Sequence, residues 1–226
     1  FSKAKFTDAH FFEAKFTDAH FFEAEFTGSA NFSWAKFTGN AHFSRAKFTE
    51  DTDFSMAKFT VSANFSWAKF TEDTDFSMAE FTGSADFSMA KFTGSANFSW
   101  AEFTGNAHFS WAKFTGNADF SKAEFTGNAN FSWAEFTGNA HFSGVEFTGD
   151  ANFSGATFEE KPQFEYALGD KTYKARFSCK ADSKDYNFEV SPDSPYKIET
   201  KEQEHNGIKF VIPEDAELFD PDEPSE

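Results

Sequence analysis

Two acidic segments are the first residues in this chain whose types and spacing suggest chemistry. The sequence TEDTD occurs twice, with the two copies 22 residues apart. Together they carry the carboxylates of Glu50, Asp51, Asp53, Glu72, Asp73 and Asp75. Clustered carboxylate oxygens can hold Ca²⁺, but neither segment has the ligand spacing of an EF-hand. A solvated acidic face is the favoured interpretation, and calcium binding stays undecided from the sequence.

The Trp and Met side chains form the second group, because all of them recur at one position of a repeated unit. They fall into two series with a 22-residue spacing: Trp34, Met56, Met78 and Trp100, and Trp67, Met89, Trp111 and Trp133. Contiguous exposed apolar side chains often mark a contact site. The alternative is that they stack on one another and shield the backbone. We name these eight residues as a candidate surface for a protein partner or a second copy of the chain.

Catalysis finds no support in the third group, which contains the Ser, Asp and His residues. These residues recur as copies of the repeat, and no nucleophile elbow, phosphate loop or zinc-binding Cys/His spacing is present. His20 and His42 are predicted neighbours, but two surface histidines are a weak metal site. We therefore expect no enzyme activity, no cofactor, no metal and no small-molecule substrate. The single Cys179 excludes an intrachain disulfide.

A repeated pair of short units must position all of these side chains. From Ala24 onward the chain repeats eleven residues, as in AEFTGSANFSW, and before that AKFTDAHFFE occurs twice. Each five- or six-residue unit has Phe at its centre and, at most positions, Ala two residues earlier. On an extended backbone these two side chains point the same way, so Phe and Ala face inward and the polar residues face water.

The spacing of the units predicts a solenoid. Apolar residues five or six apart drift around an α-helix, and units this short cannot form an antiparallel meander. A coil that turns after each unit pairs every strand with the coils above and below it. The 22-residue recurrence of TEDTDFSM indicates four units per coil, hence about seven to eight coils and a rod roughly 35 Å long.

The units A-x-F-[S/T]-x resemble the pentapeptide repeat family over about residues 1–167. The resemblance implies an all-β fold, a right-handed quadrilateral parallel β-helix. Most pairs depart from the family pattern by one inserted residue, such as Asn40 after Gly39. We expect this insertion to bulge two of the four corners in a conformation that Gly and Asn tolerate.

The chain divides into three predicted regions: a β-helix over 1–167, a C-terminal β cap over 168–212 and an acidic tail over 213–226. The cap would cover the strand edges and Phe rings at the end of the solenoid. Within the cap, the sequence predicts one hairpin from residues 171–180 and 186–190, around a turn at 183–185. It predicts a second from residues 196–201 and 208–212, around His205-Asn206-Gly207.

Charge and hydropathy reduce the number of function classes that the chain could belong to. A formal net charge of −17 disfavours direct nucleic-acid binding. No apolar run is long enough for a membrane span, and the cytoplasm is slightly favoured as the location. Stacked threonines, such as Thr49 and Thr71, are a feature of ice-binding β-helices, but each face has one rank, which favours hydrogen bonds between coils.

A non-catalytic structural or protein-interaction scaffold is therefore the expected function. The resemblance implies an alternative, a DNA-mimicking protein that binds topoisomerase (gyrase) and gives quinolone resistance. The acidic charge of the chain agrees with that alternative. The loops that interrupt the coils of some topoisomerase-binding members are absent from this sequence.

Overall fold

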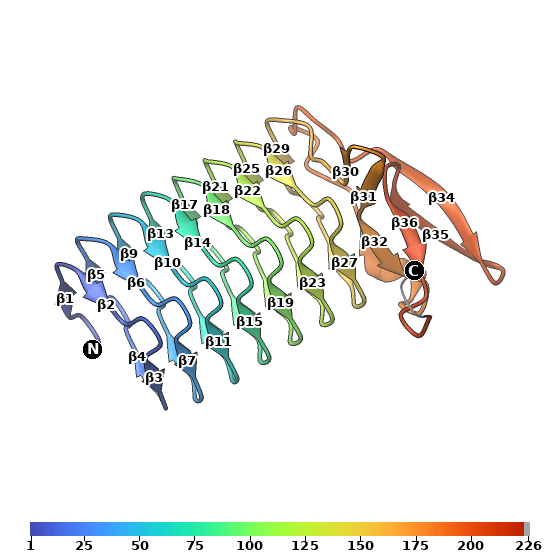
Figure 1. The fold of residues 1–226 in the computed structure, drawn as a ribbon. Helices are drawn as coiled ribbons and strands as arrows, with labels where there is room; N and C mark the ends of the chain where they lie inside the picture. Colours follow the sequence, from blue (N-terminus) through green and yellow to red (C-terminus); the bar gives the residue numbers. More distant parts are fainter. Residues whose placement is uncertain (224–226) are drawn as a thin grey trace.

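Residues 1–223 of the computed structural model are described here, and they form a right-handed parallel β-helix of about seven coils with a C-terminal cap (Figure 1). Four parallel sheets make its sides, and each coil passes through sheets A, B, C and D in turn. Strands pair with those of the next coil, 22 residues along for most of the rod, as in Phe70 with Phe92. The predicted fold class, coil number and cap are confirmed.

Sheets A and C lie on opposite sides of the rod, and most of their strands begin with a charged residue. Sheet A contains β1 (Lys5–Phe6), β5 (Glu25–Phe26), β9 (Lys47–Phe48), β13 (Lys69–Phe70), β17 (Lys91–Phe92), β21 (Lys113–Phe114), β25 (Glu135–Phe136) and β29 (Thr157–Phe158). Sheet C contains β3 (Lys15–Phe16), β7 (Lys36–Phe37), β11 (Lys58–Phe59), β15 (Glu80–Phe81), β19 (Glu102–Phe103), β23 (Glu124–Phe125), β27 (Glu146–Phe147), β32 (Arg176–Ser178) and β36 (Glu217–Phe219).

Sheets B and D form the other two sides, and their strands pair a mostly buried small residue with an outward polar one. Sheet B contains β2 (Ala9–His10), β6 (Ala30–Asn31), β10 (Thr52–Asp53), β14 (Thr74–Asp75), β18 (Ala96–Asn97), β22 (Ala118–Asp119) and β26 (Ala140–His141). Sheet D contains β4 (Ala19–His20), β8 (Ala41–His42), β12 (Ala63–Asn64), β16 (Ala85–Asp86), β20 (Ala107–His108), β24 (Ala129–Asn130), β28 (Ala151–Asn152) and β33 (Tyr186–Asn187).

Ladders of stacked Phe rings fill the interior, as the repeat predicts. Along sheet A the rings of Phe70 and Phe92 lie 4.8 Å apart and are inclined by only 2°. Across the rod, Phe54 and Phe65 meet edge to face, with centroids 5.3 Å apart and an interplanar angle of 83°. Both arrangements are favourable for aromatic quadrupoles. The coil rise of a parallel sheet therefore matches the spacing at which Phe rings stack.

The corner geometry differs from the prediction. Among the described residues, the glycines before the inserted position, such as Gly39 and Gly116, do not have positive φ. Glycine fits there because the coils approach closely: a Cβ on Gly105 would lie 2.5 Å from the backbone of Gly83. The left-handed conformation occurs instead at the other two corners, where Trp100 has a φ of 60° and Met56 a φ of 57°.

Threonine hydroxyls on sheets A and C join successive coils, as expected from their columns. Thr49 Oγ1 donates to the carbonyl of Phe26 at 3.2 Å, and Thr60 Oγ1 donates to that of Phe37 at 3.1 Å. Thr27 and Thr38 make the same bond. A hydroxyl whose proton is directed to the backbone is less available for an ordered water lattice.

The cap has a different topology from the one predicted. β32 and β33 do not form a hairpin, because each extends a sheet of the rod, and residues Ser183–Asp185 between them form a short 3-10 helix (η1). An unpredicted hairpin, β30 (Glu165–Leu168) with β31 (Lys171–Lys174), precedes them. The second predicted hairpin is present as β34 (Thr200–His205) with β35 (Ile208–Pro213), but its first strand begins four residues later than predicted. The segment expected to be an acidic tail contributes β36, and its residues 224–226 lie outside the described part.

Candidate interaction surface

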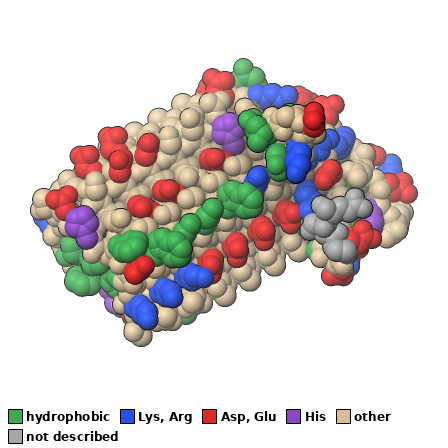
Figure 2. Space-filling model, viewed as in Figure 1, with side chains coloured by type: hydrophobic (Ala, Val, Ile, Leu, Met, Phe, Trp, Pro, Cys, Tyr) green, Lys and Arg blue, Asp and Glu red, His purple; other side chains and the backbone are tan. Residues whose placement is uncertain are grey.

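Two apolar ridges run along diagonally opposite corners of the rod. Ridge 1 consists of Trp34, Met56, Met78 and Trp100, in the turns between sheets B and C, and ridge 2 consists of Trp67, Met89, Trp111 and Trp133, in the turns between sheets D and A. Backbone bonds between coils, such as Trp34 N–H to the Ser55 carbonyl, hold each series in register. Figure 2 shows ridge 1 as a continuous green stripe. The structure thus brings together the residues of each predicted series.

The five Trp residues and Met78 of the ridges are half exposed, while Met56 and Met89 are partly buried. Trp67 keeps 53% of its accessible surface and Trp100 keeps 52%. In ridge 2 the rings of Trp111 and Trp133 stack at 5.2 Å with an angle of 8°. In this pair each ring therefore covers one face of the other and presents the rest of its surface to solvent. This arrangement contains both predicted features, mutual stacking and exposed apolar area.

Ridge 1 ends at a contact that the sequence did not reveal. Lys122 replaces the aromatic residue in the next coil, and its Nζ lies 4.4 Å from the Trp100 ring centroid and 4.3 Å from that of Tyr173. Tyr173 belongs to β31, so this cation–π contact ties the unpredicted hairpin to the ridge. A groove of about 640 Å³ lies beside it, lined in part by Glu124 and Arg176.

Charges separate along sheet C, next to ridge 1. The outward side chains at the first position of successive strands are Lys15, Lys36, Lys58, Glu80, Glu102, Glu124 and Glu146. Three lysines are therefore followed by four glutamates, a row visible in Figure 2 as blue and then red below the green stripe. At the change of sign, Lys58 Nζ lies 2.5 Å from Glu80 Oε1.

Within the glutamate part of this row, Glu124 experiences repulsion from its neighbours, while Glu80 and Glu146 are paired with Lys58 and Arg176. The pKa of Glu124 is raised, first by partial burial and then by the negative charges of Glu146 and Glu102 on the adjacent coils. Like charges in register along a parallel sheet repel one another, and a positive partner would relieve that repulsion. Sheet A has the opposite composition, because Lys47, Lys69, Lys91 and Lys113 follow one another without interruption.

The acidic segments and the histidine pair are neighbours as predicted. Asp53 pairs with Asp75 across β10 and β14, and the rings of His20 and His42 stack at 5.0 Å. Asp53 Oδ1 accepts the Ser55 N–H at 2.8 Å, so this carboxylate caps its own turn. Within residues 1–223, the six carboxylates do not bring three potential ligand atoms within 4.8 Å of one another.

Tyr186 joins β32 and β33, the two cap strands that extend sheets of the rod. Its hydroxyl donates to the Ser178 carbonyl at 2.8 Å, and burial raises its pKa well above the ordinary value. Its ring meets that of Phe177 edge to face.

Within the described part of the chain, no helix is long and apolar enough to cross a membrane.

The comparisons with known proteins agree with this architecture. A family profile described as pentapeptide repeats, in nine copies, matches residues 11–55, 76–110 and 109–157, which together exceed half of the chain. No curated protein and no solved structure matches the chain. The matched segments contain most of the Phe-centred units and six of the eight ridge residues; Met56 and Trp67 lie between the matched segments. The chain therefore belongs to the pentapeptide repeat family.

Proposed function

We propose that this protein is a non-catalytic scaffold that binds other proteins through its ridges. The support comes from the corners that lack an aromatic residue. Gly144 and Gly155 occupy the ridge position in the last coils, with φ of 68° each. The turn therefore accepts Gly, and a non-Gly residue in this conformation costs about 1–2 kcal/mol. Trp and Met are not needed for the turn, and a binding role accounts for their presence.

The working form in this proposal is a two-fold dimer through sheet C and ridge 1. A two-fold axis across sheet C between β11 and β15 would place Lys58 opposite Glu80 of the second copy. The same axis places Lys36 opposite Glu102 and Lys15 opposite Glu124, which makes six ion pairs. It also places Trp34 opposite Trp100 and Met56 opposite Met78. Both sets are self-complementary, which an isologous interface requires.

The size of this interface suits a reversible dimer. Six coils at about 4.8 Å give a matched row about 24 Å long. With ridge 1 at its rim, the contact falls near the lower limit of about 1,000 Å² for specific interfaces, so affinity on the order of micromolar is expected. Sheet A cannot pair with itself in this way, because its central residues Lys69 and Lys91 would meet lysines.

In this arrangement ridge 2 stays free and is presented twice. It lies beside Lys69, Lys91 and Lys113, so the expected partner offers apolar side chains flanked by carboxylates. Two copies of one ridge on a dimer would raise the avidity for a repetitive or dimeric partner without new contacts.

A charge swap tests the dimer. Lys36→Glu should weaken self-association about 10–100-fold, measured by sedimentation, because it converts two symmetric attractions into repulsions. Glu102→Lys alone should do the same. The double variant Lys36→Glu/Glu102→Lys should restore association, because the signs are again opposite. Lys91→Glu on sheet A is the matched control and should leave the dimer intact.

Two outcomes would contradict this arrangement. One is a wild-type chain that sediments as a monomer at high micromolar concentration. The other is a double variant that associates no better than the single variants. Partner binding is tested separately: Trp67, Trp111 and Trp133 changed to Ser should abolish recovery of a partner, while Trp34→Ser leaves ridge 2 intact and should reduce recovery only as far as it weakens the dimer.

DNA mimicry receives less support than the scaffold. A DNA mimic distributes carboxylates along its surface as phosphates lie along a duplex. Here an unbroken row of four lysines occupies sheet A, and three more begin sheet C. A supercoiling assay with gyrase decides between the two, because a DNA mimic inhibits it and the proposed scaffold does not.

A further inference from the structure

Three side chains that can bind a metal meet in the C-terminal cap, far from both ridges in sequence. Cys179 follows β32, His205 ends β34 and Asp220 follows β36. One ligand atom from each, the thiol sulfur, a ring nitrogen and a carboxylate oxygen, lies within 4.8 Å of the other two. Cys179 is buried, while the other two side chains are half buried. The backbone N–H of Cys179 donates to the Phe219 carbonyl at 2.9 Å, which fixes two of the three segments relative to each other.

The donor set selects the type of metal. Ca²⁺ and Mg²⁺ prefer sites made only of oxygen atoms, whereas a thiolate favours a softer ion. One sulfur, one nitrogen and one oxygen are all common zinc ligands, and three protein ligands leave a fourth tetrahedral position for water. We propose that Cys179, His205 and Asp220 form a zinc site in the cap.

Binding would replace a proton with the metal at sulfur. The Cys179 S–H bond breaks, the thiolate sulfur coordinates Zn²⁺, and the proton passes to solvent. Partial burial and the nearby Asp220 carboxylate raise the pKa of this thiol above its ordinary value. Burial and the Asp220 charge both favour the neutral thiol in the metal-free protein. A bound divalent cation would outweigh the negative charge of Asp220 and favour the thiolate.

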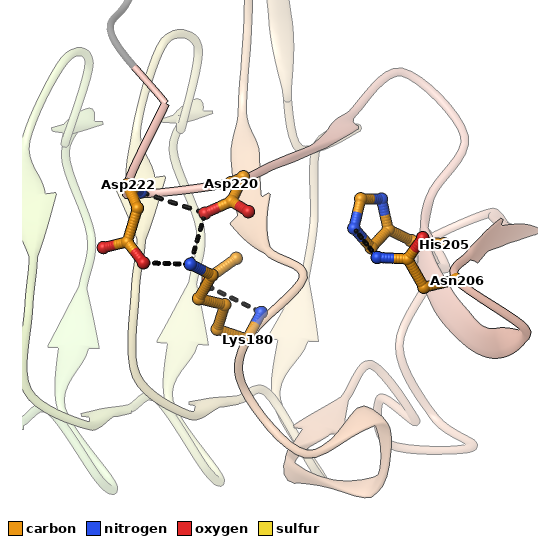
Figure 3. A network of polar contacts seen from close by, with 6 residues as sticks. Lys180, His205, Asn206, Asp220 and Asp222 are labelled. Atoms are coloured by element: carbon orange, nitrogen blue, oxygen red, sulfur yellow. Dashed lines mark hydrogen bonds and ion pairs between the residues drawn. The ribbon is translucent and has the colours of Figure 1, made fainter.

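Neighbouring side chains already orient two of the ligands (Figure 3). Asp220 Oδ1 accepts from the backbone N–H of Asp222 at 2.9 Å and lies 2.8 Å from Lys180 Nζ, and the other carboxylate oxygen points toward His205. The hydrogen bond from Lys180 lowers the pKa of Asp220. The side-chain amide of Asn206 lies beside Nε2 of His205, at 2.9 Å; turned so that its oxygen accepts from Nε2–H, it would orient the ring with the Nδ1 lone pair available for the metal. Such outer contacts set ligand orientation in known metal sites.

The metal would connect three strand ends that otherwise depend on packing. The β34–β35 hairpin contacts the rod through Phe210 and Ile212, which are fully buried. Coordination of one ion by His205, Cys179 and Asp220 would add a link between this hairpin and the last strands of sheet C. The cap covers the final Phe layer, so the proposed ion would stabilise the end of the solenoid.

Metal titration of the chelator-stripped full chain tests the proposal. Calorimetry with Zn²⁺ should show one ion per chain, and Co²⁺ should give the near-ultraviolet charge-transfer absorption of a cobalt–thiolate bond. Amide hydrogen exchange in β34 and β36 should slow by up to about a thousandfold at free Zn²⁺ a thousandfold above Kd. Exchange in the mid-rod strands β11 and β15 should not change.

Variants separate this site from nonspecific binding. Cys179→Ser should abolish the charge-transfer band and weaken zinc binding by a factor of about 100 or more, and His205→Gln should weaken zinc binding to a similar extent. His20→Gln, in the exposed stacked pair, is the matched control and should bind as the wild type does. A melting curve of metal-free Cys179→Ser that overlays the wild type shows that its cap is folded. Zinc binding unaltered by Cys179→Ser, or Co²⁺ binding without the thiolate band, would overturn the proposal.

Discussion

Replacing Phe92 by Ala tests the stacked core most directly. Phe92 is 1% exposed, and its ring stacks on Phe70 at 4.8 Å and on Phe114 at 4.9 Å. Its edge contact with Phe98 has a centroid distance of 5.9 Å. Truncating a buried Phe costs about 3–5 kcal/mol through lost burial and the cavity that remains. Loss of two stacked partners places the expected value in the upper half of that range.

The assay is urea unfolding of the purified chain, followed by circular dichroism. Because each coil contacts only its neighbours, amide exchange should accelerate most in the coils that contain Phe70, Phe92 and Phe114. The expected outcome is a lower free energy of unfolding with faster exchange centred on those coils.

Lys91→Ala is the matched control, because Lys91 precedes Phe92 and points outward from the same strand. Its free energy of unfolding should stay within about 0.5 kcal/mol of the wild type. A loss below about 1 kcal/mol for Phe92→Ala would refute the assignment of this ring to a close-packed ladder.

Three further outcomes follow from the same structure. The proposed dimer should weaken as the pH is lowered from neutral, because Glu124, which faces Lys15 of the second copy, has a raised pKa and gains a proton; sedimentation against pH checks this. Gly105→Ala should destabilise the chain by about 1–3 kcal/mol in urea, because the added Cβ meets the backbone of Gly83. Thermal hysteresis should be absent, because hydroxyls such as that of Thr49 are bonded to carbonyls.

The repeat made the rod predictable. Phe at the centre and Ala two residues earlier define the inward face of every unit, so a local pattern determines the core. The 22-residue lag then determines which residues stack, and the pairing of Thr52 with Thr74 confirms it. The alignment of the residues in both ridges follows from this 22-residue spacing. The fold is recoverable because each contact repeats a contact already present one coil earlier.

The cap and the corners were less predictable for physical reasons. Residues of β32 and β33 alternate as strands should, but the sequence does not state whether such strands pair with each other or extend a sheet. The cluster in the cap brings together Cys179, His205 and Asp220 from three segments with no repeated spacing, so no sequence pattern predicted it. The positive φ of Trp100 was missed because left-handed turns normally favour Gly or Asn.

The two-pair coil also constrains how such a gene can change length. Gain or loss of 22 residues adds or removes one whole coil, and every later side chain stays on its side of the rod. Gain or loss of eleven residues keeps Phe in the core but turns all later coils by half a revolution. Trp100 would then continue ridge 2, and Glu102 would follow the lysines of sheet A. Recombination between repeats can therefore exchange the patterns of opposite surfaces while the interior is unchanged.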